Sequence, residues 1–171
     1  MRILLDGRAA PVLAPEPVVL LWLFGDEELL SGLNAAVDRQ TGGLLKRLLA
    51  DSNWRGEPGA KLLCGCGALS LLLIGLGGRN EFAPSGFAAC LNQALDAMRD
   101  LGLKDLALTL PHSGQATGLA AVLVEVLASR DPDLEVRLLC APGELEATLY
   151  GLQQAKVRLK RSCGVTIAVR V

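Results

Sequence analysis

The acidic residues of this sequence could support hydrolysis if they held metal ions. A hydrolase with two metal ions needs several Asp, Glu or Lys ligands that converge on metals about 3.5–4 Å apart. The acidic residues here are scattered over expected helix faces and turns, where charged side chains are usually solvated. We therefore expect no catalytic residue and no metal site among them. The positions considered are Glu27, Glu28, Asp96, Asp100, Asp131, Asp133, Glu144 and Glu146.

Five cysteines and one histidine offer a second kind of chemistry. Cys64 and Cys66 could supply two zinc ligands, since alternation along a strand puts both thiols on one face, but a structural zinc site needs four ligands. His112 is far along the sequence from these thiols and from Cys90, so a cysteine nucleophile has no nearby base. The odd number of cysteines and their apolar surroundings favour reduced core thiols in a cytosolic protein. No metal or cofactor is expected.

Two glycine-rich loops between strands and helices are better candidates for ligand binding. Gly75 and Gly77 lie in the first loop, where backbone N–H groups could bind a phosphate. This loop is not the dinucleotide fingerprint, because Asn80 stands where the third glycine is required. Ser113 and Gly114 lie in the second loop. Two such loops at the carboxyl ends of parallel strands would line one crevice, although glycines at strand ends also serve simply as turns.

Alternating strands and helices must position these loops. Apolar runs of strand length alternate with segments of helical period throughout the sequence. This pattern predicts one domain over 1–171 of the α/β class, a three-layer α/β/α arrangement with a mixed, mostly parallel central sheet. Strands are expected over 17–24, 61–67, 68–74, 105–110, 135–140 and 164–171, with the second and third forming a hairpin. Helices are expected over 27–37 (short, and broken near Gly32), 44–50, 84–101, 117–130 and 144–157, and a turn over 54–60.

The composition indicates which classes of partner are expected for this chain. The 171 residues carry a net charge of −1 and are 51% hydrophobic, which suits one self-sufficient core and not a disordered chain. The apolar run 68–76 is too short for a membrane crossing, so we expect a cytoplasmic protein without a membrane partner. Nucleic acid is not an expected partner either, because balanced charge lacks the basic footprint of phosphate binding. The local basic cluster of Lys156, Arg158, Lys160 and Arg161 is better explained by the dipole of the preceding helix.

Four motifs, in their order and spacing, resemble the N-terminal domain of the cytosolic leucyl aminopeptidases. They are Asp-Arg-Gln-Thr-Gly-Gly-Leu-Leu at 38–45, Trp-Arg-Gly-Glu-Pro-Gly at 54–59, the apolar strand ending in Gly-Leu-Gly at 72–77, and Leu-Pro at 110–111. The resemblance covers roughly residues 18–160 and implies a macro-domain-like fold. In that family a separate domain carries two metal ions and a motif similar to Asn-Thr-Asp-Ala-Glu-Gly-Arg, which this sequence lacks. The resemblance therefore implies a non-catalytic domain that stands without the catalytic one.

The resemblance leaves several functions open. In these enzymes the domain helps to organise a hexamer, so self-association, or association with a separate catalytic chain, is the leading expectation. Macro domains bind ADP-ribose through an Asp after a buried strand and two glycine-rich loops, which implies Asp26 for adenine and Gly42, Gly43 and the 111–118 loop for phosphates. The Asn-Ala-Ala-Asn signature of macro domains is absent, and 34–37 only echoes it. Residual hydrolysis of such a nucleotide is a third alternative.

Overall fold

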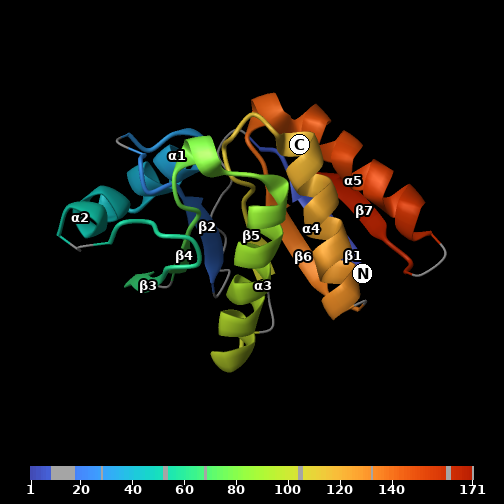
Figure 1. The fold of residues 1–171 in the computed structure, drawn as a ribbon, viewed down its shortest axis with the longest axis horizontal. Helices are drawn as coiled ribbons and strands as arrows, with labels where there is room; N and C mark the ends of the chain where they lie inside the picture. The colour runs from blue at the N-terminus through green and yellow to red at the C-terminus, as the bar shows by residue number, and fades with distance from the viewer. Residues whose placement is uncertain are drawn as a thin grey trace.

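The computed structural model describes residues 1–8, 18–27, 29–51, 54–67, 69–103, 106–131, 133–160 and 163–170. These residues form one seven-stranded sheet with helices on both faces (Figure 1). The strands are β1 (Arg2–Asp6), β2 (Val19–Leu23), β3 (Lys61–Cys66), β4 (Leu69–Gly75), β5 (Leu106–Leu108), β6 (Glu135–Leu139) and β7 (Thr166–Arg170). The helices are α1 (Gly32–Gln40), α2 (Leu44–Asp51), α3 (Pro84–Asp100), α4 (Ala116–Arg130) and α5 (Leu145–Leu159), with short 3-10 turns η1 (Arg79–Glu81) and η2 (Pro142–Glu144).

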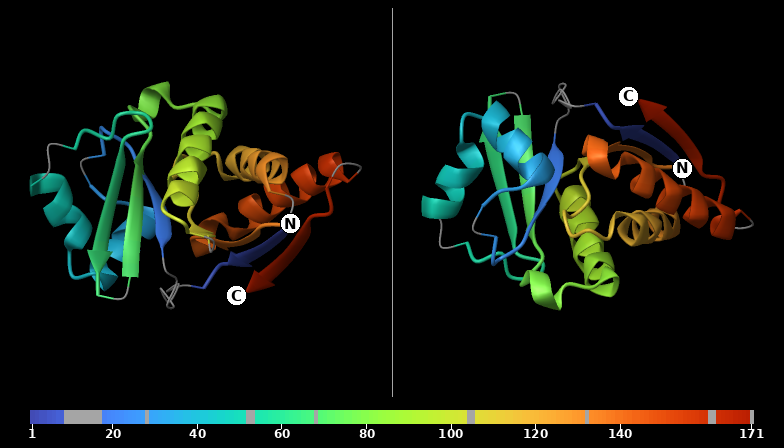
Figure 2. Two further views of the ribbon diagram at one scale, coloured as in Figure 1. Left: turned by 90° about the horizontal axis from the view of Figure 1, so that it is seen from below. Right: turned by 90° about the horizontal axis from the view of Figure 1, so that it is seen from above.

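The sheet order is β3-β4-β2-β5-β6-β1-β7. β3 pairs with β4 in the antiparallel sense, and every other pairing is parallel. Helices α1 and α2 lie on one face of the sheet, and α3, α4 and α5 lie on the other (Figure 2). The predicted three-layer α/β/α fold with a mixed, mostly parallel sheet is confirmed. No helix of the described residues is long and apolar enough to cross a bilayer.

Strand β2 lies near the middle of the sheet and is buried along its whole length. Leu20 and Trp22 face the core under α3 and α4, whereas Val19, Leu21 and Leu23 face the core under α1 and α2. The indole N–H of Trp22 donates to the carbonyl of Thr109 at 2.7 Å, so its one polar atom is satisfied inside the core. The continuous apolar run of this strand is what a strand covered on both faces requires.

Most ends of the predicted helices and strands lie within a few residues of the ends seen in the structure. The predicted hairpin of β3 and β4 is confirmed. The helix expected over 27–37 is wrong in its bounds: α1 begins at Gly32 and runs to Gln40. Gly32 has a φ of +52°, a left-handed conformation that favours glycine and separates the preceding residues from the regular helix. Cys90 and Cys140 are buried core thiols, as predicted. Residues 17, 68, 105, 161 and 171 and the Cys66 side chain, all named in the predictions, lie outside the described residues.

Strand β1 was not predicted from the sequence. It inserts between β6 and β7 and pairs in parallel with both, and Ile3 and Leu5 are fully buried under the helices. Five residues with only three apolar positions give too weak a pattern to distinguish a strand from an unstructured end. Its partners are more than a hundred residues away in the sequence.

The last residue of β1, Asp6, is the centre of a buried ion cluster. Its side chain has no exposed surface, and its oxygens accept hydrogen bonds from Arg8 at 2.6 and 2.8 Å and from Arg137 at 2.7 and 3.1 Å. Hydrogen bonds from Arg8 and then Arg137 hold the pKa of Asp6 well below its usual range, against the opposing effect of burial. This cluster links the carboxyl end of β1 to Arg137 in the middle of β6.

Replacing Asp6 by Asn should lower the free energy of unfolding at pH 7 by about 2–4 kcal/mol, because two guanidinium groups lose their counter-charge. Since the pKa of Asp6 is lower in the folded state than its ordinary value of 3.8, its stabilising contribution is complete above that pH and is lost as the pH falls below it. Urea unfolding of wild type and Asp6→Asn should therefore give a stability gap that narrows from pH 7 to pH 3. Asp100→Asn, at an exposed carboxylate, is the control. A gap that stays constant across this pH range would contradict the assignment.

Candidate functional site

The loops that follow β2, β4, β5 and β6 meet at one edge of the sheet, because these strands are parallel. Asp26, Arg79, His112 and Glu144 follow these four strands in that order. Their side chains and backbone groups contact one another from loop to loop. The candidate crevice at this edge is therefore bridged by the protein's own polar groups.

Arg79 is the residue that holds the first three loops together. Its backbone N–H donates to both carboxylate oxygens of Asp26 at 3.1 and 3.0 Å. Its guanidinium lies 4.3 Å from the centroid of the Phe24 ring, donates to the carbonyl of His112, and is 3.7 Å from a carboxylate oxygen of Glu27. Arg79 was not among the site residues predicted from the sequence. Both oxygens of Asp26, the residue proposed for adenine recognition, thus accept hydrogen bonds from the start of η1.

His112 connects the loop after β5 to the loop after β6. Its Nδ1 atom lies 2.9 Å from a carboxylate oxygen of Glu144, and half of its side chain is exposed. The ring also lies near the start of α1, since a Cβ atom placed on Gly32 would be 3.4 Å from it. The only histidine of the chain therefore joins three segments, and its position among them is structural.

Gly75 and Gly77 lie where the 54–60 turn packs against the end of β4. Their N–H groups donate to the carbonyls of Ala60 and Gly56 at 2.8 Å each. A Cβ atom at Gly75 would lie 2.2 Å from the carbonyl oxygen of Glu57, so only glycine fits there. These two N–H groups, proposed from the sequence for phosphate binding, are engaged with the backbone of the 54–60 turn.

Gly42 and Gly43 form the turn between α1 and α2, on the other face of the sheet from α4. Both have positive φ values, 64° and 79°, which glycine adopts without strain. Asp38 is buried and accepts the N–H of Lys46 at 3.1 Å, which caps the start of α2. Thr41 Oγ donates to the carbonyl of Val37 at 2.9 Å at the end of α1. The Asp-Arg-Gln-Thr-Gly-Gly motif is thus accounted for as a helix–turn–helix connection.

Gly114 lines an open hollow at the start of α4, and Ser113 precedes it in the chain. The hollow has a volume of about 510 Å³. Helix α4 begins without a side-chain cap, so its first N–H groups remain available to a ligand. Among the described residues, Ser113 Oγ is buried without a hydrogen-bond partner. The residues that line the hollow are Gly114, Gln115, Ala116, Thr117, Gly118, Gly143, Glu144 and Ala147. An anion held by backbone N–H groups is the chemistry that this hollow could support, although Glu144 opposes it with negative charge.

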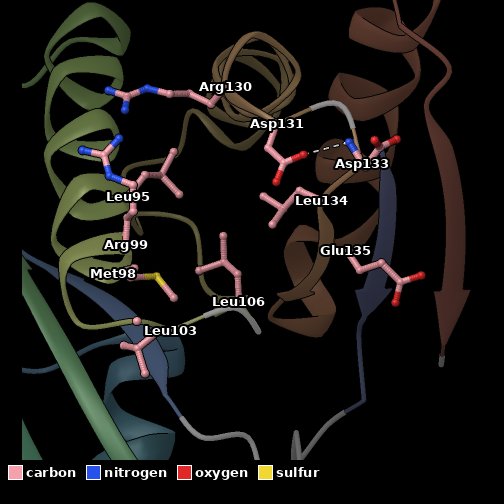
Figure 3. A pocket seen from close by; sticks show the side chains of 11 residues that line it. Leu95, Met98, Arg99, Leu103, Leu106, Arg130, Asp131, Asp133, Leu134 and Glu135 are labelled. Atoms are coloured by element: carbon pink, nitrogen blue, oxygen red, sulfur yellow. Dashed lines mark hydrogen bonds between the residues drawn. The ribbon is translucent and has the colours of Figure 1, made fainter.

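A second hollow, of about 630 Å³, lies at the opposite edge of the sheet, where β5 and β6 begin (Figure 3). No residue of this hollow was predicted as a site residue from the sequence, because its lining comes from segments that are distant in the sequence and meet only in the fold. Arg130 on its rim is engaged by Asp96 at 2.6 Å and by Asn92 at 2.8 Å. Its apolar lining consists of Leu95, Met98, Leu103, Leu106 and Leu134, and its charged rim of Arg99, Arg130, Asp131, Asp133 and Glu135.

Acidic residues that could act as metal ligands are spread over the molecule. Asp6 binds arginines at the end of β1, Asp38 caps α2, and Asp96 on α3 binds Arg130. Within the described residues, no group of three or more His, Cys, Asp or Glu side chains is arranged to hold a metal ion. The structure gives each of these three carboxylates a structural partner.

Comparison with known proteins connects this structure to one family. The family described as "Cytosol aminopeptidase family, N-terminal domain" matches residues 18–131. A protein named "Probable cytosol aminopeptidase" from Ralstonia pickettii is 30% identical over 131 residues, which make up 73% of this chain and 26% of that protein. Its counterpart from Ralstonia nicotianae is 32% identical over 96 residues, covering 54% and 19% of the two chains. The chain spans about a quarter or less of the length of these relatives.

Solved structures with the same fold are mainly macrodomains. A Trypanosoma brucei macrodomain in complex with ADP superimposes with a TM-score of 0.66 at 16% identity, covering 88% of this chain and 69% of that one. An Oceanobacillus iheyensis macrodomain mutant gives 0.69 at 14% identity, covering 91% and 93%. A tomato leucine aminopeptidase mutant gives 0.61 at 16% identity, covering 92% and 37%. At these identities the likeness shows the fold alone.

The resemblance inferred from the four motifs is confirmed by the family match, and the macro-domain-like fold is confirmed by the solved structures. All four motifs lie within the matched segment, at 38–45, 54–59, 72–77 and 110–111. The chain belongs to the cytosol aminopeptidase family, as a domain of its N-terminal type.

Proposed function

We propose that this chain is a non-catalytic domain of the cytosol aminopeptidase family that acts in assembly or protein interaction, with no peptidase activity by itself. The observation that carries the proposal is the internal use of its polar groups: Asp26, Arg79, His112 and Glu144 bind one another across the sheet edge. Such a network holds loops in place and leaves few groups for a substrate. We also propose that residues 1–171 act as one domain and that the protein works in the cytoplasm, as the name of its relatives suggests.

The partner in assembly is either a second copy of this chain or a separate catalytic chain. Exposed apolar side chains support an interaction role, because they cost free energy in water and are typical of contact surfaces when they cluster. Tyr150 and Val157 are the clearest pair, since both lie on the outer face of α5 with more than half of their surface exposed.

Sedimentation velocity of the purified chain at increasing concentration should show reversible self-association. In parallel, incubation with leucine p-nitroanilide and Mn²⁺ should give no hydrolysis above the buffer rate, because the described residues supply no converging set of carboxylates for two metals. The full-length Ralstonia pickettii aminopeptidase is the positive control for the assay. Hydrolysis that co-purifies with the chain through two chromatographic steps would refute the non-catalytic assignment.

A second candidate function is binding of ADP-ribose or a related nucleotide. It is favoured by the hollow at the start of α4, which combines helix N–H groups that no side chain caps with glycines that have open space beside them. One structural neighbour is a macrodomain in complex with ADP. The sequence-based ligand set of Asp26, Gly42, Gly43, Gly75, Gly77, Ser113 and Gly114 remains a proposal. Within it, the geometry favours Gly114, which lines the hollow, because the N–H groups of Gly75 and Gly77 already have acceptors.

Calorimetric titration with ADP-ribose, and with AMP as a control ligand, tests this function. If the hollow binds the nucleotide, saturable micromolar affinity is expected, and Gly118→Leu should weaken it at least tenfold by filling the space beside α4. Gly86→Leu is a matched control, because Gly86 is also the third residue of its helix and also has open space around it. Absence of heat at millimolar ADP-ribose would remove the nucleotide function and leave the assembly role.

A further inference from the structure

Helix α5 carries a regular stripe of exposed side chains on its outer face. Its members are spaced alternately by four and three residues, the spacing that aligns side chains along a helix that packs on another. We call this set the α5 stripe. Each of its members is exposed, and they are Glu146, Tyr150, Gln153, Val157 and Lys160.

The opposite face of α5 is fixed against α4. Thr148, Gly151, Leu152 and Ala155 are buried there. A Cβ atom on Gly151 would lie 2.1 Å from the carbonyl oxygen of Thr117, so the two helices approach backbone to backbone. Figure 1 shows α5 at one flank of the molecule, outside α4. The stripe therefore faces away from the core in a fixed orientation.

The middle of the stripe is apolar and hollowed. Tyr150 is 57% exposed and Val157 is 72% exposed, among the largest exposures of apolar side chains in the described residues. Together with Gln153, Gln154 and Arg158 they line an open hollow of about 500 Å³. A second side chain of similar size can enter this hollow and remove apolar surface from water.

The ends of the stripe carry opposite charges. Glu146 lies in the first turn of α5, and Lys160 follows its last residue. In the described part of the chain neither has an ion-pair partner, whereas the neighbouring Arg158 binds Glu125 at 3.3 Å and Glu144 contacts His112. The stripe is thus acidic at one end, apolar in the middle and basic at the other.

We propose that two copies of this chain pair through the α5 stripe in antiparallel orientation, about a two-fold axis beside Gln153. This inference rests on the proposed assembly function and names its surface. In this arrangement Glu146 lies opposite Lys160 of the second copy, and Tyr150 lies opposite Val157. A parallel arrangement would place like charges together at both ends. A two-fold contact of this kind uses the same patch on both copies and closes at the dimer.

The contact is small, so the dimer should be reversible. A helix of 15 residues is about 22 Å long, and its single stripe buries less than a standard stable interface. Most of the favourable free energy must come from Tyr150 and Val157, with the two ion pairs setting the direction of pairing. Dimerisation should accordingly weaken when the salt concentration is raised.

A charge exchange within the chain tests the pairing. Glu146→Lys and Lys160→Glu should each weaken the dimer at least fivefold in sedimentation equilibrium, because each places like charges opposite each other twice. The double variant should return the dissociation constant to within about threefold of wild type. Lys156→Glu makes the same charge change at an exposed position off the stripe and should leave the constant unchanged. Val157→Ser, also at an exposed position, should abolish the dimer without lowering the melting temperature.

The outcomes separate this inference from the proposed function. If the wild type self-associates but neither single exchange nor Val157→Ser changes the constant, the α5 stripe is overturned while assembly stands. If the single exchanges weaken the dimer and the double variant fails to restore it, the antiparallel arrangement is overturned. A wild-type chain that stays monomeric up to millimolar concentration overturns self-pairing altogether, and the assembly role then requires a catalytic chain.

Discussion

The structure depends on a strand that must be covered on both faces. All five residues of β2 are buried, and alternate side chains enter two different cores. Such a strand cannot lie at the surface or at the edge of a sheet, because each exposed face would leave leucines or Trp22 in water. It therefore requires strands on both sides and helices above and below. The positions of β4, β5, α1 and α3 follow from this one requirement.

The same requirement explains how the loops come together and why they contact each other. Parallel strands around β2 bring four loops to one edge, where open α/β sheets usually place their ligand sites. In this chain Arg79 and His112 connect those loops with hydrogen bonds and ion pairs. The edge is consequently well ordered by its own side chains, and the space that remains lies beside α4. The polar groups at this edge therefore serve mainly to hold the four loops together.

Sequence patterns predicted the parts of the fold that local chemistry determines. Pro84 in the first turn and Gly102 after the last turn predicted the bounds of α3, and the apolar run before Gly25 predicted β2. These signals lie within or directly beside the element itself. Glycines in loops were recognised, but their roles were not, since the close approach of Gly75 to Glu57 depends on a turn packed from elsewhere. The link between Asp26 and Arg79 joins positions 53 residues apart and has no local signal. The strand β1 was missed for the same reason.

The position of β1 also has a consequence for how the chain reaches its native state. Asp6 and Arg137 are separated by 131 positions, and β1 pairs on its other side with β7, the last strand. During synthesis β1 emerges first and has no neighbour until β6 and β7 have been translated. The pairings among β2 to β6 can form earlier, because they span at most 88 positions, whereas those of β1 with β6 and β7 span 133 and 164. High contact order of this kind slows folding, so insertion of β1 between β6 and β7 should be the last and slowest step, with an unpaired strand exposed until then.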